Sequence, residues 1–444
     1  MKKLIAFWLT IFLLAALFCL PAGAAYGTSP PETVSEAYIV MDTSTGQILV
    51  EKNMDQKEYP ASITKIMTAL LALENADLDD THEMTYEATH SIESGSTHVA
   101  LTEGEVVTLR ELMYAMMLTS ANDAANGIAE MIGGTIPAFV DMMNEKAAEL
   151  GCTGTHFANP HGLDNENHYT TAHDMALIAQ YALSLPDFRE FFGRDKYTMS
   201  PTNKQPKERY FWSQHEMLYD SDYTYGSATG GKLGWTPNAK HTAVTVAERD
   251  GMELLCVVMN STVASEKYKD TAALFDYCFD SFQKIILTKQ SLQGFQIPLL
   301  DGDDRQVGEV RIYPDNEVDV TVHRLYDKID LALSYNVPDA YRVGEEISPT
   351  LTVTLKKNSG AMYPLSRTYS LIYEREDYDE ETILAMRVKE PNPFWGIFFR
   401  ALGWALLGLL GLALLLFLVM VIIRFVNLSR RRRRQKRRNR RLYR

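Results

Sequence analysis

The sequence predicts a mixed α/β (α+β) protein. We expect a large domain in which strands of an antiparallel sheet flank a helical insertion, then a small β-domain and one C-terminal transmembrane helix. Strand-like segments occur at both ends of residues 35–290, with helical periodicity between them. Residues 296–388 change to short alternating runs, and residues 401–423 contain no charged side chain.

The N-terminus, residues 1–24, is predicted to be a secretory signal peptide. Lys2 and Lys3 precede a long apolar run, and Ala22-Gly23-Ala24 has the small-x-small pattern of a cleavage site. An uncleaved anchor is the alternative interpretation. Residues 25–34 form a short leader, so the fold is expected to begin after them.

The large domain, 35–290, contains a series of elements that can be assigned by period. Alternation of apolar and polar residues predicts strands, and apolar residues at helical spacing predict helices. The expected elements are a hairpin of residues 37–41 and 47–51, helices over 62–73 and 108–118, a helix from 123, strands over 232–236, 241–247 and 254–259, and a helix over 270–287.

Two of the helices have further support. Apolar residues spread widely around the axis of the helix at 62–73, so this helix is expected to be buried on most sides. Thr108-Leu109-Arg110-Glu111 has the spacing of a capping box, in which the threonine and the glutamate each satisfy a free backbone N–H group.

The small β-domain is assigned to residues 296–388 because its pattern consists of short alternating runs separated by turn residues. The runs are 310–313, 318–322, 329–333 and 351–355.

The C-terminus is predicted to cross a membrane. Residues 395–423 contain the uncharged run, which is long enough to span a bilayer, with aromatic residues near its outer end. Residues 424–444 carry twelve basic residues, an excess typical of the cytoplasmic side. We therefore expect a single-pass protein of a bacterial cell membrane, with an extracytoplasmic body and a cytoplasmic tail.

The charge distribution bears on the partners. The formal net charge is −13, but without the signal lysines and the tail there remain 30 basic residues against 57 acidic ones. A strongly acidic body disfavours nucleic-acid binding, so no nucleic-acid partner is expected. For the basic tail, contact with anionic lipid is the favoured interpretation and contact with nucleic acid the alternative.

A Ser-x-x-Lys pair, Ser62 and Lys65, lies at the start of the first predicted helix. Residues three apart share a helix face, so the lysine amine can reach the serine hydroxyl. Burial would lower the lysine pKa and let the neutral amine take the serine proton. The pattern alone is common, and Ser281 with Lys284 repeats it.

The order of later motifs distinguishes the two pairs. The first pair is followed by Ser120-Ala121-Asn122, in the break between two helices, and then by Lys232-Leu233-Gly234 on a predicted strand. The second pair is followed by Ser334-Tyr335-Asn336 but by no Lys-x-Gly sequence. Only the first set is complete.

Longer segments around these motifs resemble the serine D-Ala-D-Ala carboxypeptidases, the low-molecular-weight penicillin-binding proteins. The resemblance spans about residues 35–287, and "ASITKIMT" with "SANDAA" is its most specific part. The three similar segments are "YPASITKIMTALLALE" (59–74), "LTEGEVVTLRELMYAMMLTSANDAANGIAE" (101–130) and "THFANPHGLDNENHYTTAHDMA" (155–176). It implies a transpeptidase/β-lactamase-like catalytic domain, and residues 296–388 are similar in placement to the family's second domain.

The resemblance also implies roles for individual residues. Ser62 would be the acylated nucleophile, Lys65 its base, and Ser120 a proton relay to the leaving D-alanine. Asn122 would hold the peptide amide and Lys232 would attract the terminal carboxylate. These roles require no metal and no organic cofactor.

Period two in the predicted strand places Lys232, Gly234 and Thr236 on one face and Leu233 with Trp235 on the other. The resemblance implies that the N–H groups of Ser62 and Trp235 form the oxyanion hole. The implied substrate is a peptidoglycan stem peptide ending in D-Ala-D-Ala, and β-lactams would act as covalent inhibitors.

The strand departs from the family pattern at Leu233, where the family has threonine, and at Lys240, where it usually has glycine. Leucine cannot donate the hydrogen bond that the threonine gives to the substrate carboxylate. A charge-assisted hydrogen bond contributes about 1.5–3 kcal/mol, which is about ten- to a hundredfold in binding or rate. A weakened enzyme is thus favoured over complete loss, and a non-catalytic cell-wall-binding protein is the alternative.

Other functional classes were weighed against this one. A class A β-lactamase needs a further carboxylate for deacylation, and no Glu-x-x-Leu-Asn sequence lies between the second and third motifs. Four histidines of the segment 156–173 suggest a metal site. Their spacing does not match a metal-ligand motif, so contacts that fix the loop are the favoured interpretation. Tyr210, Phe211 and Trp212 either line a pocket or pack in the core.

Overall fold

The computed structural model describes residues 29–325, 329, 331–356, 363–380, 382–383, 406–407, 415–422 and 424. The predicted signal peptide, most of the predicted transmembrane segment 395–423 and nearly all of the basic tail lie outside these residues. In the described part of the chain we find no helix with the length and hydropathy needed to cross a bilayer.

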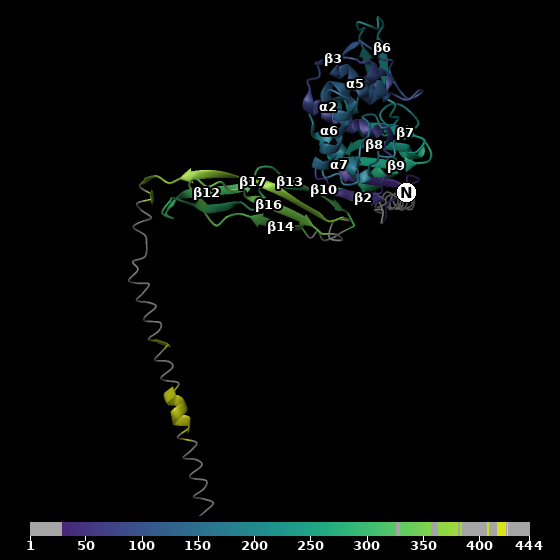
Figure 1. Ribbon diagram of the computed structural model, residues 1–444. Helices are drawn as coiled ribbons and strands as arrows, with labels where there is room; N and C mark the ends of the chain where they lie inside the picture. The colour runs from purple at the N-terminus through teal and green to yellow at the C-terminus, as the bar shows by residue number, and fades with distance from the viewer. Residues whose placement is uncertain are drawn as a thin grey trace, which may run out of the picture. The chain divides into compact units, whose positions relative to one another are not determined.

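The chain divides into two compact units, and Figure 1 labels their helices and strands. The first comprises Met1–Phe295, Tyr313–Val337 and Ser348–Ile372, and the second comprises Gln296–Ile312, Pro338–Ile347 and Tyr373–Arg444. Parts of the segment expected to form a separate β-domain therefore group with the preceding residues.

The first unit is built on a five-stranded antiparallel sheet in the order β2-β1-β9-β8-β7. Its strands are β1 (Ala37–Asp42), β2 (Ile48–Lys52), β7 (Ala228–Thr236), β8 (Lys240–Arg249) and β9 (Met252–Ser261). The predicted hairpin and the three predicted late strands are confirmed. Strands from both ends of the region 35–290 thus meet in one sheet.

The helical insertion lies between β2 and β7 in the chain, and it includes two small antiparallel strand pairs, β3 with β4 and β5 with β6. Its elements are η1 (Ala61–Thr64), α2 (Lys65–Asn75), β3 (Thr81–Glu83), α3 (Tyr86–His90), β4 (Val106–Thr108), α4 (Leu109–Thr119), α5 (Asn122–Gly133), α6 (Ile136–Glu149), α7 (Ala172–Ser184), α8 (Phe188–Phe192), β5 (Lys196–Met199) and β6 (Arg209–Trp212).

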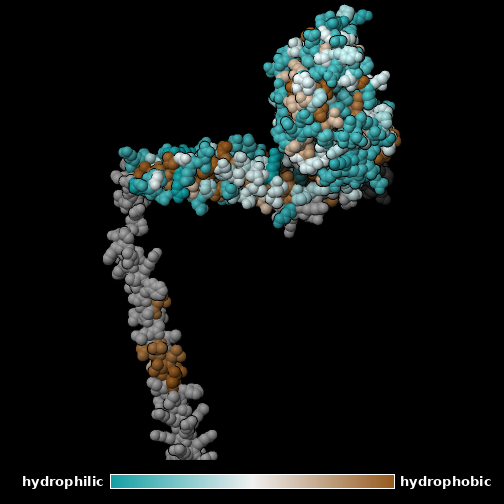
Figure 2. Space-filling view, in the orientation of Figure 1, coloured by the Kyte–Doolittle hydropathy of each residue, from teal (hydrophilic) through white to brown (hydrophobic). Residues whose placement is uncertain are grey.

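Two apolar cores occupy the two faces of the sheet. Alternation along β1 directs Ile39 and Met41 into a core shared with the insertion helices. Tyr38 and Val40 enter the opposite core, which α9 (Glu266–Ser281) covers. With apolar side chains held inside, the face of this unit visible in Figure 2 is largely hydrophilic.

Helix boundaries follow local chemistry in the insertion. Thr108 and Glu111 form the predicted capping box at the start of α4. The predicted helix at 62–73 begins as a single 3₁₀ turn, η1, before continuing as α2. α2 is buried along most of its length, as its apolar pattern predicts.

The predicted helix over 270–287 is wrong in its last third. α9 ends at Ser281, and residues Phe282–Leu287 form strand β10. β10 pairs antiparallel with β13 (Val318–His323), so its backbone groups are satisfied by a strand far away in the sequence. Phe282, the first residue of β10, is buried in the core that α9 covers, and the chain changes from helix to strand at this residue.

The later residues form the expected strands. β14 (Leu331–Asn336), β16 (Thr350–Leu355) and β17 (Leu365–Asp377) pair antiparallel in that order, and the paired residues, up to Ser370 of β17, belong to the first unit. In the second unit, the paired residues of β11 (Phe295–Leu300) run parallel to β15 (Tyr341–Arg342), and most of β12 (Gln306–Pro314) also belongs to this unit.

Candidate active site

Ser62 lies in the 3₁₀ turn that leads into α2. The preceding residue, Ala61, has a φ of 51°, a left-handed conformation that is strained for alanine. The turn is held from two sides: Thr64 Oγ1 donates to the carbonyl of Ala61 at 2.8 Å, and Thr242 Oγ1 of β8 donates to the carbonyl of Pro60 at 2.9 Å. The serine is therefore presented from a constrained turn.

The Lys65 amine is fully buried and has three partners. Its Nζ lies 3.0 Å from Ser62 Oγ, 2.7 Å from Asn122 Oδ1 and 2.7 Å from the carbonyl oxygen of His161. Burial, followed by the nearby charge of Lys232, holds the pKa of Lys65 well below its usual range. In its neutral form this amine would have two N–H donors for the two carbonyl oxygens and one lone pair that can accept the serine proton.

Ser120 and Asn122 occupy the break between α4 and α5. Ser120 is the C-cap of α4 and has a φ of 62°, so the chain turns sharply there before Asn122 starts α5. The Asn122 backbone N–H donates to the carbonyl of Thr97 at 2.8 Å. Both side chains are buried, and the Asn122 side chain reaches Lys65.

Lys232 approaches from the sheet. Its Nζ donates to Ser120 Oγ at 3.0 Å and to the carbonyl of Leu233 at 3.0 Å. Burial lowers the pKa of Lys232 to about 7. Gly234 lets β7 approach the serine, because a Cβ there would lie 2.7 Å from the Ser62 nitrogen.

The remaining residues of β7 divide between its two faces, as period two predicts. Thr236 Oγ1 donates to Asp164 Oδ1 at 2.6 Å and is buried on the Lys232 side. Leu233 is half-buried and packs against the α9 core. Trp235 is exposed at the end of the strand.

The structure thus brings the complete motif set together. Ser62, Lys65 and Asn122 are joined by hydrogen bonds, and Ser120 with Lys232 forms a second pair. The competing Ser281/Lys284 pair is not comparable: Ser281 ends α9, while Lys284 belongs to β10 and pairs with Asp319 at 2.7 Å.

Three contributions were not predicted from sequence. The carbonyl of His161 is a backbone acceptor for Lys65, so no side-chain type signals it. Gly162, the next residue, has a φ of 90°. A Cβ at its position would lie 1.9 Å from the Ala61 carbonyl oxygen, so the backbone passes close to the serine turn. Asp123 was visible within "SANDAA" but had no assigned role.

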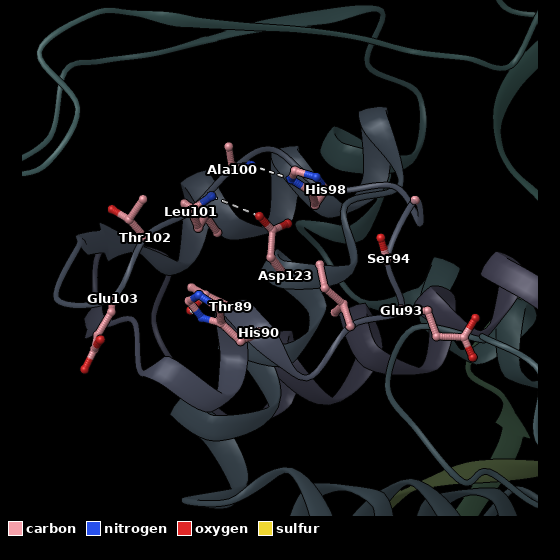
Figure 3. Close-up of a pocket in the computed structure, with 12 residues that line it drawn as sticks. Thr89, His90, Glu93, Ser94, His98, Ala100, Leu101, Thr102, Glu103 and Asp123 are labelled. Atoms are coloured by element: carbon pink, nitrogen blue, oxygen red, sulfur yellow. Dashed lines mark hydrogen bonds between the residues drawn. The ribbon is translucent and has the colours of Figure 1, made fainter.

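Asp123 fixes the loop that precedes the second motif. Its carboxylate accepts from the backbone N–H groups of Val99 and Leu101, and burial raises its pKa. It lines a cavity of about 390 Å³ together with residues of the segment 89–103 (Figure 3). Ser62, Ser120 and Lys232 do not line this cavity.

The histidine-rich loop makes structural contacts. His168 Nε2 lies 2.9 Å from Thr64 Oγ1, and its Nδ1 accepts from the Ala158 N–H at 2.9 Å. Burial lowers the pKa of His168 to about 3, so its ring is neutral. Among the described residues, no cluster of three or more His, Cys, Asp and Glu side chains is arranged to hold a metal ion.

An antiparallel sheet with a helical insertion, carrying a Ser-Lys pair opposite a second serine and a second lysine, defines a serine acyl-transfer hydrolase of the penicillin-recognising class. The family model described as Peptidase_S11, D-alanyl-D-alanine carboxypeptidase, matches residues 24–263. The chain belongs to this family.

Curated relatives agree with this assignment. The chain is 27% identical to D-alanyl-D-alanine carboxypeptidase DacF of Bacillus subtilis over 328 residues, which is 73% of this chain and 82% of the relative. It is 35% identical to DacB2 of Mycobacterium tuberculosis over 254 residues, 56% of this chain and 84% of the relative.

Solved structures show the same fold. DacD from Francisella tularensis superposes with a TM-score of 0.59 at 25% identity, covering 80% of this chain and 96% of that one. Penicillin binding protein 5 from Haemophilus influenzae has a TM-score of 0.64 at 24% identity, covering 79% of this chain and all of the other, and supports the fold alone.

Proposed function

We propose that this protein removes the terminal D-alanine from peptidoglycan stem peptides that end in D-Ala-D-Ala, through an acyl-enzyme on Ser62. The observation that carries the proposal is the buried, pKa-lowered Lys65 amine 3.0 Å from Ser62 Oγ. The relatives bear the name of this activity. β-Lactams are expected to acylate the same serine.

In the proposed acylation step, the neutral Lys65 amine takes the Ser62 proton as Oγ attacks the carbonyl carbon of the penultimate D-alanine. The charge that develops on the carbonyl oxygen is stabilised by the N–H groups of Ser62 and Trp235. The closeness of Gly234 to the Ser62 nitrogen supports this pairing, because it holds the β7 backbone beside the serine.

Ser120 and Lys232 are proposed to serve the leaving group. Collapse of the tetrahedral intermediate breaks the peptide C–N bond, and Ser120 relays to the departing D-alanine amine the proton that Lys65 took from Ser62, which leaves Lys65 neutral again. Lys232, when charged, attracts the terminal carboxylate and polarises the Ser120 hydroxyl, with which it is hydrogen-bonded. Water then attacks the acyl-enzyme carbonyl, and the neutral Lys65 takes the water proton and passes it to Ser62 Oγ as the ester bond breaks, which frees Ser62.

A cell-wall-binding protein without turnover is the alternative, and Leu233 is its main support. Two observations disfavour it. Lys65 is hydrogen-bonded to both Ser62 and Asn122. The Leu233 side chain packs against the α9 core rather than beside Lys232. The loss of binding or rate that leucine causes at this position is limited to the contribution of one hydrogen bond.

We also propose that the protein is exported and anchored in a bacterial cell membrane by the segment 395–423, with residues 424–444 in the cytoplasm. The domain boundaries 35–290 and 296–388 are part of this proposal. It rests on the uncharged run and on the basic excess that follows it. The described residues 415–422 are apolar and exposed, as Figure 2 shows.

A paired assay tests the activity. Wild type, Ser62→Ala and Leu233→Thr are incubated with a fluorescent penicillin and with a diacylated Lys-D-Ala-D-Ala peptide. We expect wild type to be labelled and to release D-alanine, Ser62→Ala to do neither, and Leu233→Thr to change the rate by less than about a hundredfold. Wild type that does neither, with both restored in Leu233→Thr, would establish the wall-binding alternative.

A further inference from the structure

The hairpin of β5 and β6 carries two exposed aromatic rings side by side. Tyr210 is 54% exposed and Trp212 is 60% exposed, and their ring centroids lie 6.0 Å apart at an interplanar angle of 29°. Large exposed aromatic side chains that adjoin one another mark binding surfaces more often than isolated ones do. The residue between them, Phe211, is buried in the helical core.

Alternation gives this hairpin two chemically distinct faces. The inner face holds Phe211 and Tyr197, and Tyr197 stacks on Tyr114 of α4 with a centroid distance of 3.9 Å. On the outer face Trp212 lies opposite Lys196, and Tyr210 lies opposite Thr198. The outer face thus combines two flat apolar rings with an ammonium group and a hydroxyl, all solvent-exposed.

The hairpin is fixed to the elements that position the active site. It packs against α4, the helix whose C-cap is Ser120. The loop joining β5 to β6 is bonded to the chain at the start of β4: Asn203 Oδ1 accepts from the Val106 N–H at 2.9 Å, and its Nδ2 donates to the Gly104 carbonyl at 2.8 Å. Figure 1 shows β6 at the same end of this unit as β3, the partner of β4.

A buried ion pair strengthens this attachment. Arg209 of β6 pairs with Glu105, whose side chain is fully buried, and Thr202 Oγ1 donates to the same carboxylate at 2.7 Å. The segment containing Glu105 leads back to Leu101 and Val99, which Asp123 holds at the start of α5. The two exposed rings are therefore set in a rigid position relative to Ser120 and Asn122.

We propose that Tyr210 and Trp212 form a platform for the glycan strand of peptidoglycan. A pyranose ring presents C–H groups on one face, which pack on aromatic rings, and hydroxyl or acetamido groups at its edge, which Thr198 and Lys196 can bind. The occupant follows from the substrate, because the stem peptide is covalently attached to this glycan. The inference rests on the proposed function, and it adds a second contact with the same polymer.

The test uses the full chain in detergent micelles. One probe is a fluorescent glycan strand from which an amidase has removed the peptides, with binding followed by anisotropy. D-alanine release is measured in parallel on a short diacylated Lys-D-Ala-D-Ala peptide and on polymeric peptidoglycan. The variants are Tyr210→Ala/Trp212→Ala, the conservative Trp212→Phe, and the matched control Tyr86→Ala, which removes a ring that is 62% exposed on α3.

We expect Tyr210→Ala/Trp212→Ala to lower glycan affinity, and kcat/KM on the polymer, by about tenfold. Its kcat/KM on the short peptide stays at the wild-type value, which also shows that the variant is folded. Trp212→Phe retains most of the binding, and Tyr86→Ala retains all of it.

Wild-type glycan affinity in Tyr210→Ala/Trp212→Ala would overturn the platform, as would an equal loss in Tyr86→Ala. A change in self-association alone, measured by sedimentation, would also overturn it and assign the rings to contact between copies. Failure of the proposed function gives a different result, since wild type would then release no D-alanine from the short peptide.

Discussion

Two buried lysines dominate the chemistry of the site at the scale of single residues. Lys65 and Lys232 are both nearly inaccessible to solvent, and the charge of Lys232 disfavours a second charge on Lys65. Burial and the Lys232 charge therefore both favour the neutral form of Lys65. In the proposed mechanism, neutral Lys65 and charged Lys232 would give Ser62 a base and the substrate carboxylate a cation.

The two lysines predict a bell-shaped pH dependence of kcat/KM. On the acid side activity rises as Lys65 loses its proton, at a pH well below the usual lysine range. On the alkaline side activity falls above about pH 7, as Lys232 loses its charge. A bound substrate carboxylate favours the charged form of Lys232, so the alkaline limb of kcat should lie at higher pH than that of kcat/KM.

Stopped-flow acylation and steady-state kinetics across the pH range check this assignment. In Lys232→Arg the charge persists, and we expect the alkaline limb near pH 7 to disappear even if the maximum rate is lower. An alkaline limb that is unchanged in Lys232→Arg would assign that titration to another group.

The site residues that act through their side chains could be predicted from the sequence. Ser62, Lys65, Ser120, Asn122 and Lys232 are all recognised from spacing and order, and the structure brings them within hydrogen-bonding reach of one another in two groups. The third partner of Lys65 was not predictable, because every residue has a backbone carbonyl. Only the folded chain specifies that the carbonyl of His161 meets this amine.

At the scale of elements, the turn before α2 is the most constrained part of the site. Ala61 has a left-handed backbone conformation. Its carbonyl oxygen accepts a hydrogen bond from Thr64 Oγ1, and a Cβ at Gly162 would lie 1.9 Å from the same oxygen. Strain of this kind persists only where the surroundings over-determine the conformation. We infer that the loop around Gly162 and the strand residue Gly234 together keep the serine in place.

Substitution of Gly162 by alanine tests this view. Its φ is 90°, and a Cβ would lie 1.9 Å from the Ala61 carbonyl oxygen, which is backbone and cannot rotate away. We expect Gly162→Ala to lower the free energy of unfolding by more than about 3 kcal/mol and to slow acylation of Ser62. Chemical denaturation and labelled-penicillin kinetics measure the two effects.

Gly134→Ala is the matched control. Gly134 also has a positive φ, 72°, but nothing lies within 4 Å of the position of its Cβ. Alanine at this position should lower the free energy of unfolding only through its left-handed conformation, by about 1–2 kcal/mol, and should leave acylation of Ser62 unchanged. Equal costs for the two variants would show that crowding at Ala61 contributes little.

At the scale of the whole molecule, late strands belong to the same unit as the catalytic sheet. Gln47, just before β2, exchanges two hydrogen bonds with the backbone of Thr321 in β13, at 2.6 and 3.2 Å. Asp42 at the end of β1 accepts from the Thr321 hydroxyl. The pairing of β10 with β13 extends this attachment.

The proposed membrane anchor should be separable from catalysis, because every proposed site residue lies between positions 62 and 236. Deletion of residues 391–444 is expected to move the protein from the membrane fraction to the soluble fraction, with kcat/KM on a short peptide unchanged. Deletion of 425–444 alone is the control and should leave the protein in the membrane fraction. Membrane retention after the larger deletion would contradict the anchor.

The order of motifs, the capping box, the sheet strands and the family resemblance could all be obtained from the amino-acid sequence, because each depends on neighbours within a few turns or on a long specific match. The end of α9 at Ser281, the packing of Leu233 against the α9 core and the exposure of Tyr210 and Trp212 required the tertiary structure. Each of these depends on a partner far away in the chain: β13 for β10, α9 for Leu233, and α4 for the inner face of the hairpin. Local periodicity cannot specify such partners, since a strand and a helix of the same residues differ mainly in what lies beside them.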